Sequence, residues 1–229
     1  MKVLVTRAEE DCAPLEDLLR ARGLAPVRMP CIAIEDLPLE RAPAGPGPDF
    51  VVVSSPHAAR RLRGRFPGAR FAAVGASTAS ALGPGLDLLL PRSGAGADAL
   101  LETLAPLVRG KTVLLPGAEE GNPGLPAQLE AAGARVIAVP LYRTVAASRA
   151  DPAVLAALRA GDLAAVAFAS GSAARGFVAL AGAGAAPRVA CMGRLCADEA
   201  RRAGLRVDAV GQGGLPSLCD AVEAALSGR

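Results

Sequence analysis

Short runs of apolar residues alternate along the chain with longer segments in which apolar residues recur every three or four positions. The run VLV at residues 3–5 is followed by Leu15, Leu18 and Leu19, and then by Gly23. A short apolar run is typical of a buried strand, and apolar residues three and four positions apart form one face of a helix. A glycine just past such a helix supplies the left-handed residue that ends it. The order strand, helix, glycine and second strand predicts a β-α-β unit with parallel strands.

This β-α-β pattern occurs twice. The segment VLVTRAEE, which begins at Val3, returns as VLLPGAEE at Val113, and at the same spacing Gly23 matches Gly133. The second strands are APVRMPCIAIE in the first copy and RVIAVPLYRTV in the second. Each copy therefore predicts two neighbouring strands of a parallel sheet.

A second element also repeats. FVVVSSPHAARRL, which begins at Phe50, is similar to VAFASGSAARGF, which begins at Val166, and Ser55 falls on Ser170. Each copy is followed by a strand that ends in glycine and then by a helix, in FAAVGASTASAL and VACMGRLCADEA. The order along the chain is A-B-A′-B′, which predicts two similar α/β lobes built from one duplicated plan.

Two segments of irregular composition separate the A and B elements of each pair. They are EDLPLERAPAGPGPD and RTVAASRADP, and both are typical of linkers. If the lobes were sequential, the chain would cross between them once, whereas two linkers at equivalent places favour an exchanged arrangement with two crossings. We therefore expect one discontinuous lobe from residues 1–36 and 148–229, linkers at 37–48 and 142–147, and a second lobe from 49–141.

Composition and charge exclude several classes of protein. Among 229 residues, 25 Lys and Arg stand against 22 Asp and Glu, and Trp is absent. The basic run RRLRGR at residues 60–65 is interpreted as the solvated face of a helix, because no aromatic platform for stacking bases accompanies it. Five cysteines without a C-x-x-C pair, with a single His, provide no set of zinc ligands and indicate free thiols in a reducing compartment. Charged residues near the N-terminus leave no apolar core of a signal peptide, and no apolar stretch reaches the roughly 18 residues that a membrane span requires. We therefore expect a cytoplasmic protein that binds neither membrane nor nucleic acid.

Candidate ligand-binding residues follow the predicted strands. In open parallel sheets, ligands bind beyond the carboxyl ends of the strands. The segments expected there are rich in glycine, small hydroxyls and backbone N–H groups at helix starts, and poor in catalytic acids and bases; they are residues 6–7, 54–57, 75–78, 116–120, 169–172 and 193–196. Because helix N-termini attract anions, two lobes with this lining predict a cleft for a ligand with several carboxylates or phosphates.

These features also have structural interpretations. Ser55 and Ser170 are equally good helix N-caps. The glutamate pairs at residues 9–10 and 119–120 are interpreted as first-turn residues that stabilise helix dipoles, not as a paired-carboxylate site. The segment SGAGAD at residues 93–98 lacks the third glycine of a dinucleotide-binding loop.

The single His and the single Tyr are separate cases. His57 has no Ser and Asp arranged with it as a hydrolase triad, so surface or capping use is the simpler interpretation. Tyr142 is expected at a strand end, where an aromatic ring commonly serves packing. Its expected position at the mouth of the cleft also makes it a candidate functional residue.

Six segments, in this order, resemble the uroporphyrinogen-III synthase family over essentially the whole chain. They are VLVTRAEE, VVVSSPHAARRL, AVGASTASAL, VLLPGAEE, VIAVPLYRTV and CMGRLCADEARRAGLRVDAV. The resemblance implies two flavodoxin-like lobes of parallel sheets flanked by helices, one formed by both chain ends and one by the middle. It also implies that a two-stranded linker joins the lobes and that a cleft lies between them.

The resemblance further implies a cyclising hydro-lyase without a metal or organic cofactor. Its substrate would be hydroxymethylbilane, a linear tetrapyrrole with eight carboxylate side chains. Loss of the terminal hydroxyl gives an electrophilic azafulvene, ring D attacks through its substituted carbon to form a spiro intermediate, and reclosure leaves ring D inverted. The uncatalysed closure gives the uninverted isomer, so the main task of the enzyme would be to impose a geometry.

The same resemblance implies roles for individual residues. Tyr142 matches the family tyrosine that helps the hydroxyl leave, and we expect it to be the catalytic proton donor. A cysteine stands at a position where the family has threonine, and His57 stands where the family commonly has another residue after proline. The expected substrate-binding residues are Arg7, Ser55, Thr78, Ser170, Ser172 and Cys196, and no residue is expected to bind metal.

Two rival functions stay open at this stage. A two-lobed binding or sensor domain for a small anionic or sugar ligand would have the same architecture and linkers. A flavodoxin-like electron carrier is disfavoured because aromatic residues to sandwich a flavin are nearly absent. We expect a monomer whose partner is the bilane, handed over by the deaminase that precedes it.

Overall fold

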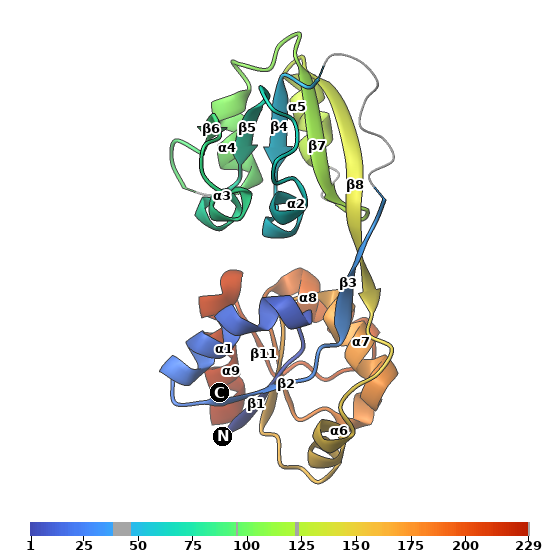
Figure 1. Ribbon diagram of the computed structural model, residues 1–229. Helices are drawn as coiled ribbons and strands as arrows, with labels where there is room; N and C mark the ends of the chain where they lie inside the picture. Colours follow the sequence, from blue (N-terminus) through green and yellow to red (C-terminus); the bar gives the residue numbers. More distant parts are fainter. Residues whose placement is uncertain (39–46, 95, 122–123, 229) are drawn as a thin grey trace. The chain divides into compact units, whose positions relative to one another are not determined.

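The chain divides into two compact units. The computed structural model describes residues 1–38, 47–94, 96–121 and 124–228. Unit 1 comprises Met1–Ile34 and Thr144–Arg229, and unit 2 comprises Glu35–Arg143 (Figure 1). Unit 1 therefore contains both chain ends.

Unit 1 is built on a parallel sheet. Its strand order among the described residues is β11-β10-β9-β1-β2, and each neighbouring pair is parallel. The strands are β1 (Lys2–Val5), β2 (Ala25–Arg28), β9 (Ala165–Phe168), β10 (Arg188–Cys191) and β11 (Ala209–Val210). The short apolar runs predicted as buried strands are thus confirmed in this unit, and the central strand β9 is buried at every residue.

Helices cover both faces of this sheet (Figure 1). They are η1 (Glu9–Asp11), α1 (Cys12–Ala21), α6 (Pro152–Arg159), α7 (Gly171–Ala181), η2 (Ala183–Ala185), α8 (Arg194–Arg202) and α9 (Gly214–Ser227). Val3 and Val5 pack on the side of α1 and α9, whereas Leu4 packs on the side of α6, α7 and α8. This alternation follows from the two-residue period of a strand, and it makes both faces of the sheet apolar.

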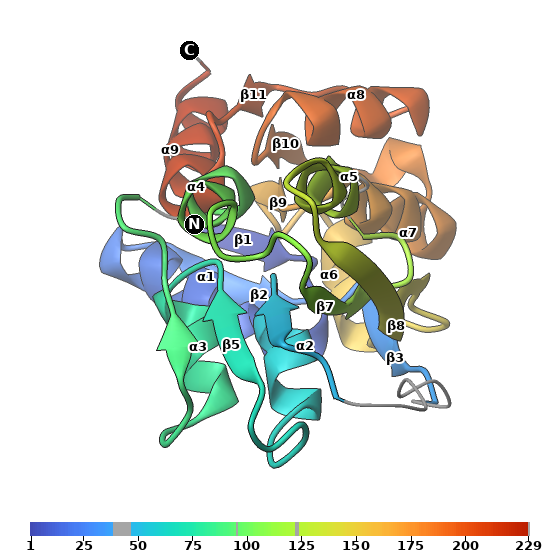
Figure 2. The same cartoon turned by 90° about the horizontal axis from the view of Figure 1, so that it is seen from above.

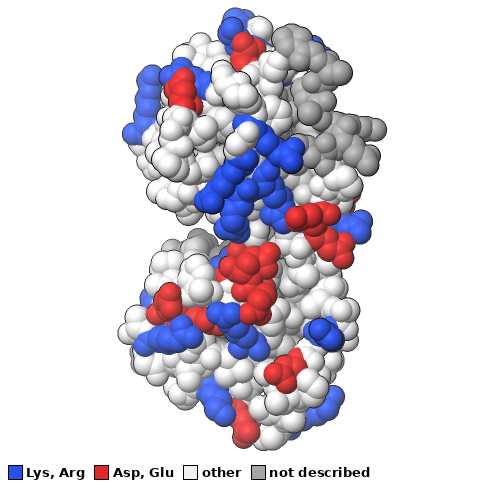
Figure 3. All heavy atoms as spheres, in the orientation of Figure 1, with Lys and Arg blue, Asp and Glu red and all other residues white. Residues whose placement is uncertain are grey.

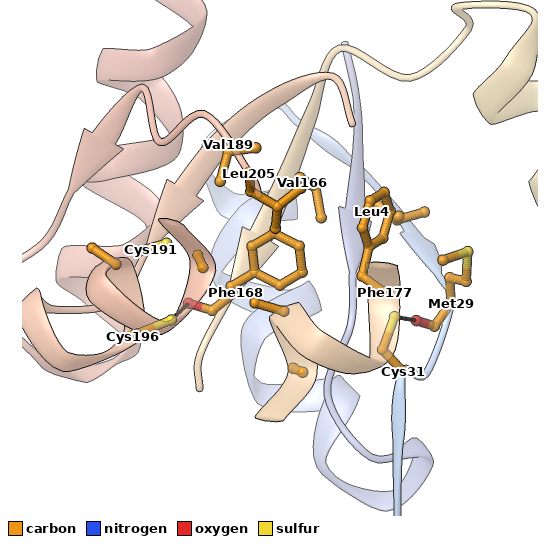
Figure 4. Packing of buried hydrophobic residues seen from close by; sticks show 14 of the residues in the cluster. Leu4, Met29, Cys31, Val166, Phe168, Phe177, Val189, Cys191, Cys196 and Leu205 are labelled. Carbon is orange, nitrogen blue, oxygen red and sulfur yellow. Dashed lines mark hydrogen bonds between the residues drawn. The ribbon is translucent and has the colours of Figure 1, made fainter. Parts of the chain in front are cut away.

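The core on the α7 and α8 side is centred on two phenylalanines. The rings of Phe168 on β9 and Phe177 on α7 meet edge to face, with their centroids 5.6 Å apart (Figure 4). Both side chains are completely buried. This packing fixes α7 against the sheet and so fixes the position of its N-terminus beyond β9.

Unit 2 repeats the plan of unit 1. Its sheet order is β3-β8-β7-β4-β5-β6 among the described residues. The strands are β3 (Ile32–Asp36), β4 (Phe50–Val53), β5 (Arg70–Ala73), β6 (Leu88–Leu89), β7 (Thr112–Ala118) and β8 (Arg135–Ala146). From β6 to β8 this order matches the order from β11 to β2 in unit 1, and the neighbouring strands are again parallel.

The strand pairing is exchanged between the repeats. β1 of the first β-α-β copy pairs with β9 of the second B copy, and β4 of the first B copy pairs with β7 of the second β-α-β copy. The chain passes from one unit to the other within β3 and again within β8, which are neighbours in the sheet. Residues 142–146, which we expected in a linker, belong to β8. Residues 39–46 of the other expected linker lie outside the described residues.

The helices of unit 2 are shorter. They are α2 (Pro56–Arg61), α3 (Ala76–Leu82), α4 (Ala97–Leu104) and α5 (Gly124–Ala131). α2 and α3 lie on one face of the sheet, and α4 and α5 on the other, where they pack on Phe50, Val52 and Val113 (Figure 2). No described helix in either unit is both long and apolar enough to span a bilayer.

One interpretation of the repeat is wrong. Glu119 and Glu120 follow the seven-residue strand β7 in a turn, and α5 begins only at Gly124, so these glutamates are not in the first turn of a helix. In the first copy, Glu9 and Glu10 do lie in the helical turn η1. The second copy differs because β7 extends to Ala118, three residues beyond the predicted apolar run at 113–115.

A buried carboxylate ties α1 to β2. Glu16 is 3% exposed, and it accepts hydrogen bonds from two nitrogens of Arg28, one of them 2.9 Å away, and from Arg20 at 3.2 Å. The hydrogen bond from Arg28 is the main cause that lowers the pKa of Glu16 below its ordinary value of 4.5. The interaction therefore stabilises the fold above pH 4.5, and this stability is lost as the pH falls through the lower folded-state pKa.

We predict that Glu16→Gln lowers the free energy of unfolding at pH 7 by on the order of 1 kcal/mol, because the arginines lose the carboxylate charge and one of its two acceptor oxygens becomes an NH2 donor. The difference from the parent protein should shrink as the pH is lowered below 4.5, as measured by urea unfolding at several pH values. Asp17→Asn is the control, since the Asp17 side chain is 76% exposed and pairs with Arg20 at the surface. An equal loss in both variants at pH 7 would contradict the prediction.

Helix α7 approaches the backbone of Cys31 so closely that only glycine fits at position 176. A Cβ atom built on Gly176 would overlap the carbonyl oxygen of Cys31. We predict that Gly176→Ala lowers the free energy of unfolding by about 2 kcal/mol or more, because backbone atoms cannot move aside as a side chain can. Gly184→Ala is the control, since nothing lies within 4 Å of its Cβ position. Denaturant midpoints that are the same for both variants would overturn this account.

Candidate functional site

The carboxyl ends of parallel neighbours bring separate parts of the chain to one edge of each sheet. In unit 2, β4 is followed by Ser55, β5 by Thr78 and β7 by Glu119, while β8 carries Tyr142. Each of these positions was expected at a strand end. The sheet order β8-β7-β4-β5 makes them neighbours, although they are far apart in sequence.

Ser55 joins two elements of this edge. Its side chain is the N-cap of α2 and accepts a hydrogen bond from the backbone N–H of Ala58 at 3.1 Å. The same Oγ lies 2.9 Å from the hydroxyl of Tyr142, and either atom can be the donor in this pair. When Ser55 donates, the phenol proton of Tyr142 is left for a ligand. Capping and contact with the candidate catalytic residue are therefore two uses of one side chain.

An irregularity in strand pairing places Tyr142 within reach of Ser55. Gly117 of β7 pairs with Pro140, but the next residue, Ala118, pairs with Tyr142, so Leu141 is an extra residue on β8. Such a bulge changes the direction in which the following side chains point. The backbone N–H of Glu119 then donates to the Tyr142 carbonyl at 2.8 Å, which holds β8 in place beyond the bulge.

Two side chains of α2 contact the Tyr142 ring. The guanidinium carbon of Arg61 lies 5.2 Å from the ring centroid, and the His57 ring centroid lies 5.5 Å from it. Tyr142 itself is 7% exposed. Figure 3 shows basic side chains gathered over the α2 region of unit 2, where the run at residues 60–65 lies. Interpreting this run only as a solvated helix face overlooked Arg61, whose side chain is 22% exposed.

The sequence did contain a signal for Arg61. His57 and Arg61 are four residues apart on one helix and so share a face, directly after the N-cap Ser55. What the sequence could not show is that the tyrosine of β8 lies against that face.

A cavity of about 520 Å³ opens beside Tyr142 within unit 2. Its polar part is lined by Ser54, Ser55, Glu119 and Tyr142, and its wall is mainly apolar. The wall includes Leu115, Pro116, Leu125, Pro126 and Val139. A flat apolar ring with polar substituents is the kind of group that such a lining accommodates.

The remaining candidate of unit 2 is Thr78. It lies in the first turn of α3 and is 2% exposed, whereas Ser77 beside it is exposed. Backbone N–H groups in this turn, at the carboxyl end of β5, are suited to an anionic ligand.

Unit 1 presents a similar edge. Ser170 is the N-cap of α7 and accepts from the backbone N–H of Ala173 at 3.2 Å, while its Oγ lies 2.9 Å from the Oγ of Ser172. Arg7 follows β1 and pairs with Asp11 at 3.8 Å. The structure thus brings Ser170, Ser172 and Arg7 to the carboxyl edge of one sheet, because β1 and β9 are paired neighbours.

Cys196 points into the core of unit 1. It is 6% exposed, and its thiol donates to the carbonyl oxygen of Phe168 at 3.4 Å (Figure 4). Hydrogen bonding with Cys196, together with burial, raises the pKa of the Cys191 thiol. A thiol whose hydrogen is already bonded to the backbone has little left to donate to a ligand.

The two edges favour positioning over strong acid–base chemistry. Among the described residues, no group of three or more His, Cys, Asp and Glu is arranged to hold a metal ion. Apart from the Glu119 carboxylate and the His57 ring, the functional groups that gather are a phenol, serine hydroxyls and backbone N–H groups at helix starts. These groups donate hydrogen bonds to carboxylates and can pass one proton.

The fold and the carboxyl edges of its sheets define a two-unit α/β protein with helix N-termini at the carboxyl ends of parallel strands. Residues 13–213 match the sequence profile described as uroporphyrinogen-III synthase HemD. This chain belongs to the uroporphyrinogen-III synthase family.

Individual relatives agree with this assignment. The chain is 30% identical over 196 residues to the uroporphyrinogen-III synthase of Synechococcus elongatus, covering 78% of this chain and 74% of that protein. Its structure is similar to uroporphyrinogen-III synthetase from Helicobacter pylori, with a TM-score of 0.65 at 19% identity over 100% of both chains. A mutant uroporphyrinogen III synthase from Thermus thermophilus gives a TM-score of 0.52 at 22% identity, again over 100% of both chains. At these identities the structural likeness concerns the fold.

Proposed function

We propose that this protein closes hydroxymethylbilane to uroporphyrinogen III, with inversion of ring D and loss of water. The observation that carries the proposal is the family match over residues 13–213, which includes every candidate site residue except Arg7. The function is thus that of a cyclising hydro-lyase of tetrapyrrole biosynthesis. The family match favours this activity over a two-lobed binding or sensor domain.

Tyr142 is proposed to start the reaction. Its phenol proton passes to the terminal hydroxyl of the bilane, and the carbon–oxygen bond breaks so that the electron pair leaves with water. The pyrrole nitrogen of the same ring supplies the electrons for the new exocyclic double bond, which gives the azafulvene electrophile. The proton that ring D releases after closure restores the phenol. The contact between Ser55 and Tyr142, 2.9 Å between oxygens, supports this role because a Ser55 donor stabilises the tyrosine oxygen as it loses its proton.

Substrate binding is proposed to rest on hydrogen-bond donors at the strand ends. The serines and Thr78 mark helix starts, where backbone N–H groups and the helix dipole favour carboxylates. Arg7 adds a positive charge, which is partly compensated by its ion pair with Asp11. Cys196 contributes by supporting the start of α8, since its thiol bonds the Phe168 carbonyl. The proposed binding residues are Arg7, Ser55, Thr78, Ser170 and Ser172, with Cys196 as a structural support of α8.

Positioning then supplies the specificity. The uncatalysed closure gives the other isomer, so the enzyme must hold ring D with its substituted carbon toward the electrophile. Holding reacting atoms in a productive geometry contributes on the order of 7–11 kcal/mol in well-oriented systems. We further propose a cytoplasmic monomer that receives the bilane from the deaminase that makes it.

We predict that freshly prepared hydroxymethylbilane incubated with the protein yields the inverted isomer, uroporphyrinogen III. The products would be oxidised and separated by isomer, with a sample that lacks protein as the control for spontaneous closure. Protein that leaves the isomer ratio at the control value, while binding the bilane and releasing it unchanged, would instead identify a binding domain.

We predict that Tyr142→Phe lowers kcat by about 10²-fold or more, the usual contribution of a positioned proton donor, and leaves KM nearly unchanged. Activity should fall without disappearing, because positioning of the bilane does not depend on the phenol proton. Steady-state kinetics at saturating bilane measures this. A variant that retains the parent kcat would remove Tyr142 from the mechanism.

A further inference from the structure

Arg61 holds its charge over the Tyr142 ring through three contacts. Its Nε donates to Asp36 at 2.7 Å, its Nη2 also bonds Asp36, and its Nη1 donates to the carbonyl of His57 at 3.0 Å. These contacts hold a planar guanidinium in a fixed orientation at the end of α2. The position of the charge over the ring is therefore set by the fold.

The distance between this charge and the ring is short enough for a cation–π interaction. A guanidinium within about 6 Å of an aromatic centroid is attracted to the ring face, and the measured separation is 5.2 Å. The attraction grows when the ring gains negative charge, as Tyr142 does while its proton leaves. Because Tyr142 is 7% exposed and the Arg61 side chain 22% exposed, water screens this interaction only in part.

We propose that Arg61 is a positioning residue for the cyclisation: it stabilises the charge that develops on Tyr142 as the phenol proton passes to the departing hydroxyl. The inference rests on the proposed function. Arg61 acts through Tyr142 and need not touch the bilane. It extends the site to the end of α2, whereas Arg63 of the same run donates to the carbonyl of Ala81 at 2.8 Å.

The competing explanation is mechanical, because Arg61 also links α2 to β3 through Asp36. Asp36→Asn separates the two, because Asn keeps the Oδ1 acceptor that Arg61 bonds, and so keeps the guanidinium beside the ring, while it removes the carboxylate charge. The Asp36 side chain is 73% exposed, so the fold should tolerate this change. A purely mechanical Arg61 would make Asp36→Asn and Arg61→Gln equally harmful.

The test compares Arg61→Gln with the matched control Arg63→Gln, which removes one charge from the same run. Arg61→Gln should lower kcat by about tenfold with KM unchanged, because the lost interaction acts only in the transition state. Arg63→Gln should retain the parent kcat, and Asp36→Asn should lower it less than Arg61→Gln does. Arg61→Lys, which keeps the charge without the planar fork, should recover part of the loss.

A double-mutant cycle decides whether Arg61 acts through Tyr142. In a Tyr142→Phe background, which has no proton to give, Arg61→Gln should have no further effect on kcat. Tyrosine fluorescence reports the state of this ring alone, because the chain has one Tyr and no Trp. Arg61→Gln should alter that emission while circular dichroism and the unfolding midpoint confirm a folded protein.

The outcomes separate this inference from the proposed function. If the parent protein fails to make the inverted isomer, the proposed function is wrong and this inference is wrong with it. If the parent makes that isomer but Arg61→Gln keeps its kcat, raises only KM, or adds its full effect to Tyr142→Phe, the function stands and the inference is overturned. Should Arg61→Gln not fold, Arg61→Lys in the same cycle gives the same decision.

Discussion

The site depends on parallel strand pairing, which places the carboxyl ends of neighbouring strands at one edge of a sheet. Each β-α-β unit can contribute only a few donors at the start of its helix. Pairing β8, β7, β4 and β5 side by side brings Tyr142, Ser55 and Thr78 to one edge of unit 2. The same rule brings Arg7 and Ser170 together in unit 1. Within each unit, the packing of helices on both faces of the apolar sheet holds these strand ends in place.

Duplication explains why the two edges are similar, and local departures from it explain how they differ. Ser55 and Ser170 occupy equivalent N-caps, yet only Ser55 has a phenol beside it. The difference arises on β8, where an extra residue in the pairing with β7 turns Tyr142 toward Ser55. In the proposed mechanism, the edge of each unit binds anions, and the edge of unit 2 also carries out proton transfer.

The chemistry of this edge suits a reaction that already proceeds without a catalyst. Backbone N–H groups at helix starts and small hydroxyls are the groups proposed to orient a substrate with many carboxylates, and this role needs no strongly shifted acid or base. In the proposed mechanism, Tyr142 donates the one proton that must move. Arg61 and Ser55 surround that phenol with a positive charge and a hydroxyl, both suited to an oxygen that is losing its proton.

Local features of the sequence determined much of this protein. Periodic apolar residues predicted the strands and the helices, because these depend on near neighbours along the chain. The order of these elements predicted the parallel pairing, and the repeat predicted two similar units. The likeness to the synthase family also came from the sequence, and with it Tyr142 as a candidate. The extension of β7 to Ala118 was missed, since the apolar run at 113–115 ends before the strand does.

Only the tertiary structure decided which side chains meet. That Ser55 both caps α2 and reaches Tyr142, 87 positions away, depends on strand order and on one bulge. That Cys196 turns its thiol to the Phe168 carbonyl, and Arg61 its charge to the Tyr142 ring, depends on helix packing. The physical reason is that the spacing of apolar and polar residues around a position indicates whether its side chain is buried and which face of a helix it lies on. The partners of that side chain come from elements that lie far away in the sequence.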